Sequence, residues 1–425
     1  CTYNSIYGMN AEGKGYPAIR MNEFDGLFTG KPTQFAHNFL LEDFKKHQLK
    51  ENDILICRTN GNPNLVGKSA LVMIDEPYVY ESHLFKIQPK QEIINSHTLA
   101  TYLNCKYGKQ EIFRYSMQGN QSNFSLAKFK EMKIPKFSSA LQKDIKILIS
   151  SSFEKLQKSK EAYQAAQDLL LDHLGLKDFN LPAQAVNIKS FADSFGTSGR
   201  LDAEFYQEKY EKLIDKIKSY PKGYNTLDYF IKDFSTGFAY KSETYTETGI
   251  PLIRINNIGN GTLDISNAML IPQGDISLSP KDVANENDIL ISMSGTIGNS
   301  CKVPKGVNAV VNQRIMRISP QNINVEVLPL IINSIIGKYQ LERMGTGGVQ
   351  TNISANDIKQ IVIPNVEEKI QTQIADLIRQ SNYLRIKSKG LLEKAKKAVE
   401  LAIEKDQESA LDFIKGKQTN DCNVH

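Results

Sequence analysis

The chain has 425 residues, of which 40% are hydrophobic and 23% charged, and its formal net charge is +5. This length suffices for two or three domains with cores of their own, while no apolar run reaches the roughly eighteen residues of a membrane span. The weak positive charge permits a polyanionic partner without requiring one.

The cysteines and histidines indicate no metal site. The five cysteines have no CxxC spacing and are accompanied by only six histidines, so neither a zinc site nor a disulfide framework is expected. We therefore expect no metal in this chain, no membrane association and a cytoplasmic location. The first residue is Cys1 rather than Met, which suggests that the sequence begins inside a longer polypeptide.

A glycine-rich loop follows the first strongly apolar run. The stretch RTNGNPNLVGKSALV (residues 58–72) comes directly after DILIC and contains a glycine followed by lysine and serine, as a phosphate-binding loop does. That motif needs four residues between its glycines, whereas Gly61 and Gly67 enclose five, and one of them is Pro63, which has no N–H to donate. The spacing therefore disfavours an ATP site.

An internal repeat organises the chain. The hexamer ENDILI occurs at residues 51–56 and again at 286–291. Three further matches keep the same order: YPAIRMNEFDG with IPLIRINNIGN, ESHLFKIQP with NQRIMRISP, and QSNFSLAKFKEMKIP with QTNISANDIKQIVIP. The offset drifts only from 235 residues (51 to 286) to 229 residues (121 to 350), which predicts that a whole domain was duplicated.

The second copy of the glycine loop has different side chains. Its counterpart is SMSGTIGNSCKV (residues 292–303), which lacks the glycine–lysine–serine sequence. A catalytic phosphate loop is not expected to survive in one copy alone. The element common to both copies is therefore a strand, a polar glycine loop and a second strand.

Local patterns divide the chain into six segments. Short β-branched and apolar runs broken by Gly, Asn and Pro predict two β-rich domains, and helical periodicity predicts a long helix after each. The segments are a first domain (1–138), a first helix (139–176), a connector (177–200), a second domain (201–365), a second helix (366–415) and a frayed tail (416–425). By the offset, about 35 residues at the head of the first domain are missing.

The connector is expected to be ordered, because Phe179, Val186, Ile188 and Phe191 are available to pack. The segment RLDAEFYQEKYEKLIDKI (residues 200–217) predicts an amphipathic helix that opens the second domain and has no counterpart in the first copy.

The two long helices carry the same stripe of small residues. At spacings of seven it contains Ile145, Ser152, Ser159 and Ala166 in the first helix, and Ile374, Ser381, Ser388 and Ala395 in the second. Small residues along a heptad seam let two helix backbones approach closely. We expect an α+β fold in which two tandem β-rich domains are each followed by a long helix, with the helices packed as an antiparallel coiled-coil-like pair and a pseudo-twofold relation. The alternative is that each helix merely covers its own sheet.

Polar loops at matched places in the two copies are the candidate functional site. Arg, Lys, Asn, Gln, Ser and Thr are suited to hydrogen bonding with base edges in the major groove, although each residue taken singly is more typical of a turn or a cap. As a set they predict a DNA-binding surface. The candidates are Arg58, Asn60, Asn62, Lys68, Gln118, Asn120, Gln121 and Asn123 in the first copy, and Tyr240, Lys241, Ser294, Thr296, Arg343, Thr346, Gln350 and Asn352 in the second.

Two blocks of sequence resemble a known family. The block GTGGVQTNISANDIKQIVIPNVEEKIQTQIADLI (residues 345–378) is similar to the end of a target-recognition domain and the start of the following helix in specificity (S) subunits of type I restriction-modification systems. The stretch RLDAEFYQEKYEKL resembles a common opening of that family's second recognition domain, and the likeness extends over both copies. Glu368 and Gln371 are close to the family's Glu-Gln pattern without matching it fully.

The resemblance implies a specific division of labour. Each target-recognition domain would recognise one half of a split site in double-stranded DNA, and the helices would set the gap and dock two modification (methyltransferase) subunits. S-adenosylmethionine would be bound by those subunits, and ATP and Mg by restriction (translocase and nuclease) subunits, so that this chain would need no cofactor and perform no catalysis.

Other classes of function remain open at the level of sequence. The chain has no Pro-Pro, no Pro-Asp, no HExxH and no GxSxG, so methyltransferase, nuclease, metalloprotease and hydrolase motifs are missing. One alternative is the DNA-recognition portion of a single-chain type II restriction-methyltransferase with catalytic domains before Cys1. Another is a twin-domain adaptor that binds other proteins.

Overall fold

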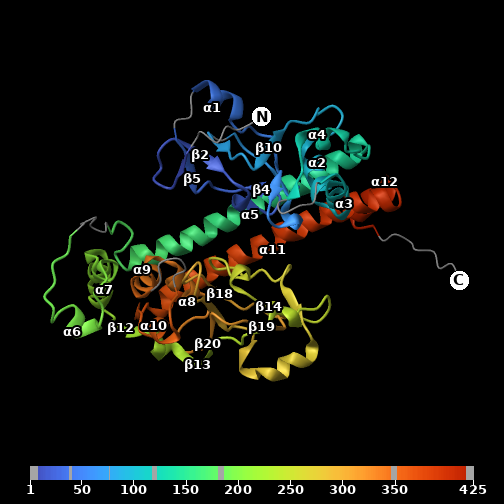
Figure 1. Cartoon of the computed structure of the whole chain (residues 1–425). Coiled ribbons are helices and arrows are strands. Elements are labelled where there is room, and N and C mark those ends of the chain that lie inside the picture. The colour runs from blue at the N-terminus through green and yellow to red at the C-terminus, as the bar shows by residue number, and fades with distance from the viewer. Residues whose placement is uncertain are drawn as a thin grey trace. The chain divides into compact units, whose positions relative to one another are not determined.

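The computed structural model describes residues 8–37, 41–75, 77–116, 122–179, 186–345 and 352–417. They form two compact units: unit 1 contains Cys1–Ser159 and Asn382–His425, and unit 2 contains Lys160–Ser381. The division passes through both long helices, α5 (Ser139–His173) and α11 (Glu368–Glu404), which are the green and red rods of Figure 1. Each unit therefore includes part of both helices.

Unit 1 combines short strands with a small group of helices. Its strands are β1 (Met9–Asn10), β2 (Tyr16–Ile19), β3 (Phe24–Asp25), β4 (Phe28–Thr29), β5 (Gln34–Ala36), β6 (Ile54–Cys57), β7 (Thr59–Asn60), β8 (Ser69–Leu71), β9 (Val79–Tyr80), β10 (Leu84–Ile87) and β11 (Ser122–Asn123). They form sheets ordered β1-β5-β2-β9, β10-β6-β8-β4-β3 and β11-β7. Its shorter helices are α1 (Leu41–His47), α2 (Ser96–Asn104), α3 (Lys106–Tyr115), α4 (Leu126–Glu131) and α12 (Gln407–Lys415).

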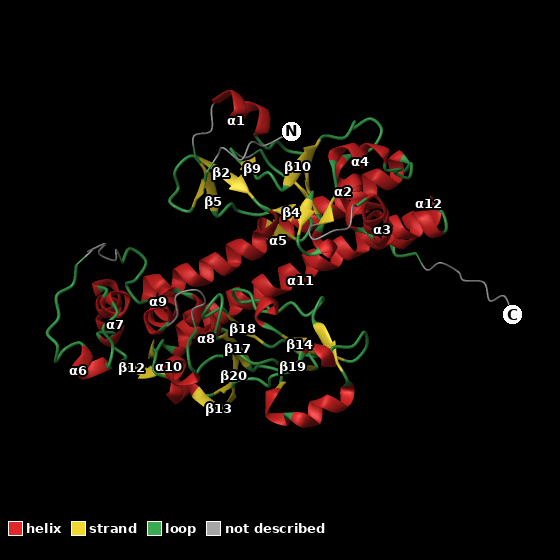
Figure 2. Ribbon diagram, viewed as in Figure 1, coloured by secondary structure: helices red, strands yellow, loops and turns green. Residues whose placement is uncertain are grey.

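Unit 2 has the same kinds of element (Figure 2). Its strands are β12 (Tyr224–Thr226), β13 (Ile231–Ser235), β14 (Ile250–Ile253), β15 (Met269–Ile271), β16 (Val283–Ala284), β17 (Ile289–Ser292), β18 (Ser300–Lys302), β19 (Ala309–Val311), β20 (Ile315–Pro320) and β21 (Val362–Pro364). The sheets are β12-β21, β13-β20-β17-β18 and β15-β14-β19-β16. Its shorter helices are α6 (Phe195–Ser198), α7 (Glu208–Lys218), α8 (Val327–Asn333), α9 (Ile335–Met344) and α10 (Ala355–Lys359).

Strand pairing confirms the duplication in the central strands of the two units. In unit 1, β2 runs parallel to β9 and β6 lies antiparallel between β10 and β8. In unit 2, β14 runs parallel to β19 and β17 lies antiparallel between β20 and β18. The registers also match, since Ile56 pairs with Ser69 in unit 1 and Ile291 pairs with Ser300 in unit 2. The central strands β6 and β17 are buried along their whole length, as their mostly apolar sequences predict.

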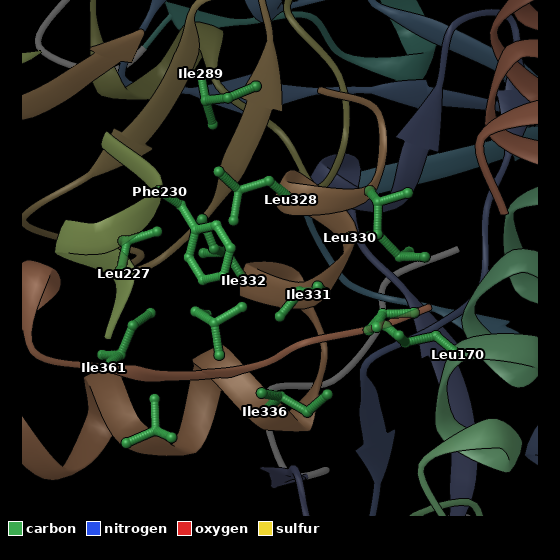
Figure 3. Close-up of a cluster of buried hydrophobic side chains, with 14 of the residues drawn as sticks. Leu170, Leu227, Phe230, Ile289, Leu328, Leu330, Ile331, Ile332, Ile336 and Ile361 are labelled. Atoms are coloured by element: carbon green, nitrogen blue, oxygen red, sulfur yellow. The ribbon is translucent and has the colours of Figure 1, made fainter. Parts of the chain in front are cut away.

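Each unit has its own hydrophobic core. In unit 2 the largest cluster joins Ile289 of β17 to Leu328 and Ile332 of α8 and to Ile336 of α9 (Figure 3). The cluster also includes Leu170 of α5, so the end of that helix is part of this core. Burying this many branched apolar side chains is the main stabilising contribution of the unit.

The two long helices contact each other through serines inside unit 1. The Ser152 hydroxyl donates to the Ser388 carbonyl oxygen at 2.9 Å, and the Ser388 hydroxyl donates to the Ser152 carbonyl oxygen at 2.8 Å. At the end of this contact the Ser138 backbone N–H donates to the Gln407 side-chain oxygen at 2.6 Å. From the first of these contacts along the chain to the second, the residue number rises from 138 to 152 on the α5 side and falls from 407 to 388 on the α11 side. The two chain segments are therefore antiparallel in this unit.

The rest of the predicted stripe is also buried. Ile145 and Ala395 lie in the core cluster of unit 1, and Ala166 and Ile374 lie in that of unit 2. Ser159 and Ser381 are likewise buried. The stripe thus faces packed interior in each unit, while a coiled-coil-like supercoil and a pseudo-twofold axis stay predictions.

Two expectations about segment ends and connectors are corrected. The second long helix ends at Glu404 instead of continuing to residue 415, because Asp406 has an extended backbone and its side chain caps a new helix, α12, by accepting from Ser409 N at 2.8 Å. In the connector Phe179 packs against the core of unit 2, but Val186, Ile188 and Phe191 are exposed. The availability of apolar side chains therefore did not imply their burial. No helix in the described part of the chain is long and apolar enough to cross a membrane.

Candidate nucleic-acid interface

Three distant segments of unit 2 meet where β17 ends and β20 begins. Met293 N donates to Arg314 O at 2.9 Å, and Ile353 N donates to Met293 O at 3.0 Å. Ser294 forms an antiparallel bridge with Asn352. We call this meeting point, which comprises residues 292–299, 312–314 and 352–353, the unit 2 junction. It brings the glycine loop and the second polar loop of this copy together.

Unit 1 has the same construction. Arg58 N donates to His83 O at 2.8 Å, Phe124 N donates to Arg58 O at 2.7 Å, and Thr59 pairs with Asn123. These contacts occupy the positions that the sequence repeat aligns with those of unit 2. We call residues 57–67, 81–83 and 122–124 the unit 1 junction. The two junctions share their backbone hydrogen bonds and differ in their side chains.

A buried aspartate supports the strands that lead into the unit 2 junction. Asp288 precedes β17, and its side chain accepts from Arg317 at 3.0 Å, from Ser319 at 2.6 Å and from the backbone N–H of Asn285 at 2.9 Å. Asp288 and Arg317 are 3% and 2% exposed. A charge at such a depth needs both a counter-ion and hydrogen bonds, and here it has both.

Unit 1 repeats this arrangement at the aligned positions. Asp53, which is 1% exposed, accepts from Gln88 at 2.6 Å and from Lys50 N at 2.9 Å, and Lys86 Nζ lies 3.4 Å from its carboxylate. The aspartate in each copy of ENDILI is therefore explained by the fold, since its side chain links the start of the central strand to the neighbouring strand, β10 in unit 1 and β20 in unit 2.

A glycine closes each glycine loop against a helix. Gly67 has a φ of +81° and Gly298 a φ of +79°, and a Cβ at either position would overlap a side chain, Ile112 of α3 or Leu341 of α9. Only glycine allows both the left-handed backbone and the close approach. The glycine before Lys68 is thus required for packing.

Most of the described candidates of unit 1 are either turn residues or half-buried cations. The Asn60 side chain accepts from Asn62 N at 2.8 Å and the Asn62 side chain accepts from Asn64 N at 3.1 Å, so both stabilise the turn. Lys68 is half-buried, and burial lowers the pKa of its ammonium group. Arg58 is half-buried at the junction.

Three candidates of unit 2 are used by the fold and are corrections to the predicted surface. Tyr240 is buried in a small apolar cluster, and its hydroxyl donates to Asp275 O at 3.3 Å. Ser294 is buried completely. The Arg343 guanidinium donates to Phe205 O at 2.9 Å, lies over the Phe205 ring, and has its pKa lowered by burial. None of the three presents an open polar side chain to a duplex.

Other candidates of unit 2 lie at the surface. Lys241 and Thr296 are exposed, and the half-buried Asn352 accepts from the Arg314 guanidinium at 2.6 Å. Gln118, Asn120, Gln121, Thr346 and Gln350 fall outside the residues that the structure describes. Within the described ranges no group of three or more His, Cys, Asp or Glu side chains could hold a metal ion.

The sequence prediction missed two residues at the junctions. Arg314 and His83 occupy aligned positions, and both are exposed. The pair could have been noticed because ESHLFKIQP and NQRIMRISP align His with Arg within otherwise similar strands. Their position beside the polar loops depends on the three-dimensional fold and could not have been found from that alignment.

Comparisons with known proteins agree with this two-part construction. A family model described as "Type I restriction modification DNA specificity domain" matches residues 6–162 and 228–397. The specificity subunit of the type I restriction enzyme MjaVIII of Methanocaldococcus jannaschii is 21% identical over 402 residues, 90% of this chain and 87% of that protein. The specificity subunit of the type I restriction enzyme EcoAI of Escherichia coli is 37% identical over 70 residues, 16% of this chain and 12% of that protein. A solved S subunit of a type I restriction-modification system from M. genitalium has a TM-score of 0.34 and 14% identity, covering 96% of this chain and 93% of that one.

Proposed function

We propose a mode of DNA recognition for this chain, which belongs to the type I restriction modification DNA specificity family. It is a type I restriction-modification specificity subunit with two DNA-recognition domains. In the proposed mode, the unit 1 junction contacts one half of a bipartite site in double-stranded DNA, and the unit 2 junction contacts the other half.

One observation carries this proposal: the two junctions share a backbone and differ in side chains. The hydrogen bonds between Arg58 and His83 and between Met293 and Arg314 are equivalent. A frame that both units share, with different polar side chains at its tips, can place different donors and acceptors against different base edges. Two such frames in one chain suit a site whose halves have different sequences.

The long helices provide the separation between the two half-sites in this proposal. A helix of 35 residues, the length of α5, is about 52 Å long, which exceeds the roughly 34 Å of one turn of B-DNA. Each unit incorporates part of both α5 and α11, which supports a coupling between helix length and gap length. Exposed parts of these helices would dock the two modification subunits.

Catalysis would be supplied by partner subunits. The matched relatives are named specificity subunits, which implies a non-catalytic role for this chain. We propose that S-adenosylmethionine is bound by the modification subunits, and ATP and Mg by the restriction subunits. The net charge of +5 is small, so partner subunits would also provide much of the contact with DNA phosphates.

Loop exchange in the assembled methyltransferase tests the mode of recognition. The full chain is co-expressed with its modification subunits, and residues 58–68 are replaced by the corresponding loop of a relative that recognises another sequence. Sequencing of methylated host DNA should show one changed half-site and one unchanged half-site. The matched control exchanges residues 293–299 and should change the opposite half. Exchanges that leave the methylated sequence intact would contradict the proposal.

A change in helix length tests the spacer. Deleting seven residues from α5 together with the seven facing residues of α11 should shift the gap and leave both half-sites alone. The logarithm of the affinity for DNA should fall linearly with the logarithm of the salt concentration. The affinity of an apolar protein interface, as in an adaptor, would depend only weakly on salt.

A further inference from the structure

The Arg314 backbone has a conformation that is unusual for its residue type. Four described residues other than glycine have a positive φ, and three of them are asparagines, which tolerate this region. The fourth is Arg314, with a φ of +67°. Its carbonyl oxygen accepts from Met293 N, and the next residue, Ile315, is buried and paired with Ser292. The surrounding sheet therefore holds an unfavourable conformation in place, as is common at ligand-binding positions.

The Arg314 side chain is exposed and oriented. One terminal nitrogen of its guanidinium, NH1, donates to the Asn352 side-chain oxygen at 2.6 Å. No carboxylate in the described part of the chain forms an ion pair with it. A guanidinium has five N–H donors in a planar fork, so the Asn352 contact fixes the group while donors remain for a ligand.

The aligned position in unit 1 has a different side chain. His83 makes the same backbone contact, but its imidazole lies 3.8 Å from the Glu81 carboxylate and does not satisfy Asn123, the counterpart of Asn352. The Asn123 side-chain oxygen is buried and has no partner among the described residues. The arginine–asparagine pair is thus specific to the second domain.

We infer that Arg314, held by Asn352, contacts a guanine in the half-site of the second recognition domain. This inference rests on the proposed function. Arginine donates two parallel hydrogen bonds to O6 and N7 of guanine in the major groove, and a fork already oriented by a neighbour loses less freedom on binding. His83 cannot form that fork, so the first domain recognises its half-site by other contacts.

Methylation by the assembled enzyme tests the inference. The Arg314→Gln enzyme should lose its preference for guanine at one position of one half-site. It should accept several bases there or prefer adenine, because glutamine pairs with N6 and N7 of adenine. Discrimination between guanine and the other bases at that position should decrease by a factor of about 5 to about 150, and the other positions should keep their sequence. The control is Lys305→Ala, which removes an exposed positive charge from the same unit and should leave the sequence unchanged.

Arg314→Gly separates recognition from folding. Glycine accepts a φ of +67° freely, so the variant should unfold at a urea concentration no lower than the native chain does and yet lose the same guanine preference. A uniform loss of rate with the methylated sequence intact would assign Arg314 to a phosphate and overturn the inference. If loop exchange alters the half-site while both Arg314 variants leave it intact, the proposed function stands and this inference fails. If neither has an effect, both fail.

Discussion

The contact between Ser152 and Ser388 makes a quantitative prediction about the packing of the long helices. Their hydroxyl oxygens lie 2.8 Å apart, and the two residues are 0% and 2% exposed. Each hydroxyl donates to the carbonyl oxygen of the other helix. We consider the changes Ser152→Ala, Ser388→Ala, their combination, and Ser152→Leu.

The geometry sets the expected magnitudes. Each alanine removes one donated bond and leaves no buried donor without a partner, because the remaining serine still reaches a backbone carbonyl. Each single change should therefore cost about 1 kcal/mol, and the pair about 2 kcal/mol, with little coupling. Ser152→Leu loses the same bond and forces bulk between two close backbones, which adds about 1 to 3 kcal/mol. Its total cost should be about 2 to 4 kcal/mol.

Urea unfolding of the full chain, followed by circular dichroism, measures these values. Hydrogen exchange at residues 145–156 and 388–399 locates the loss in unit 1. The matched control is Ser151→Ala, one residue along the same helix and half-buried, which should be nearly neutral. If Ser152→Leu were tolerated as well as Ser152→Ala, the inference that small residues permit a close helix contact would be refuted.

Two further predictions concern the frame of the junctions, and a third concerns His97, a buried histidine of α2. Gly67→Ala should cost more than 2 kcal/mol, because it strains a φ of +81° and overlaps Ile112, and the Ile112→Ala background should reduce that cost. Arg317→Met should cost about 3 to 5 kcal/mol because it leaves a buried aspartate without its counter-ion, and Lys86→Met should cost less because Lys86 is 15% exposed. Burial lowers the pKa of His97 from 6.5 to about 4, so the unfolded chain binds a proton first and stability should fall by about 3 kcal/mol between pH 6.5 and pH 4.

Each of these three predictions has its own measurement. Urea midpoints compare the glycine and ion-pair variants, and equal losses for Arg317→Met and Lys86→Met would contradict the link between burial and cost. For His97, the stability difference between the native chain and His97→Leu should change with pH only across that window. A difference that stays constant would mean that the imidazole is protonated alike in both states.

The duplication could be predicted from the sequence because its register-setting residues recur. ENDILI preserves the buried aspartate, and the alignment of ESHLFKIQP with NQRIMRISP places Lys86 and Arg317 as the matching partners. The small-residue stripe likewise predicted buried helix faces, since spacing along a helix determines which residues share a side. Local periodicity and repeated letters were sufficient for these features.

The exposure of the candidate side chains was harder to predict, because it depends on contacts between distant segments. Tyr240 and Arg343 have side chains suited to DNA, but their partners, Asp275 and Phe205, lie far from them in sequence. The left-handed backbone of Arg314 has no sequence signal, since arginine rarely adopts it. Polar composition therefore did not separate residues that stabilise a turn from those whose side chains remain open.

The discontinuity of unit 1 has a consequence for synthesis on the ribosome. Unit 2 ends at Ser381, whereas the core of unit 1 also needs Leu392, Ala395 and Val399 from α11. The domain that is translated first is therefore the last to be completed. Until those residues leave the exit tunnel, a nascent chain exposes the apolar side chains that they will cover, and it is during this interval that chaperones matter most.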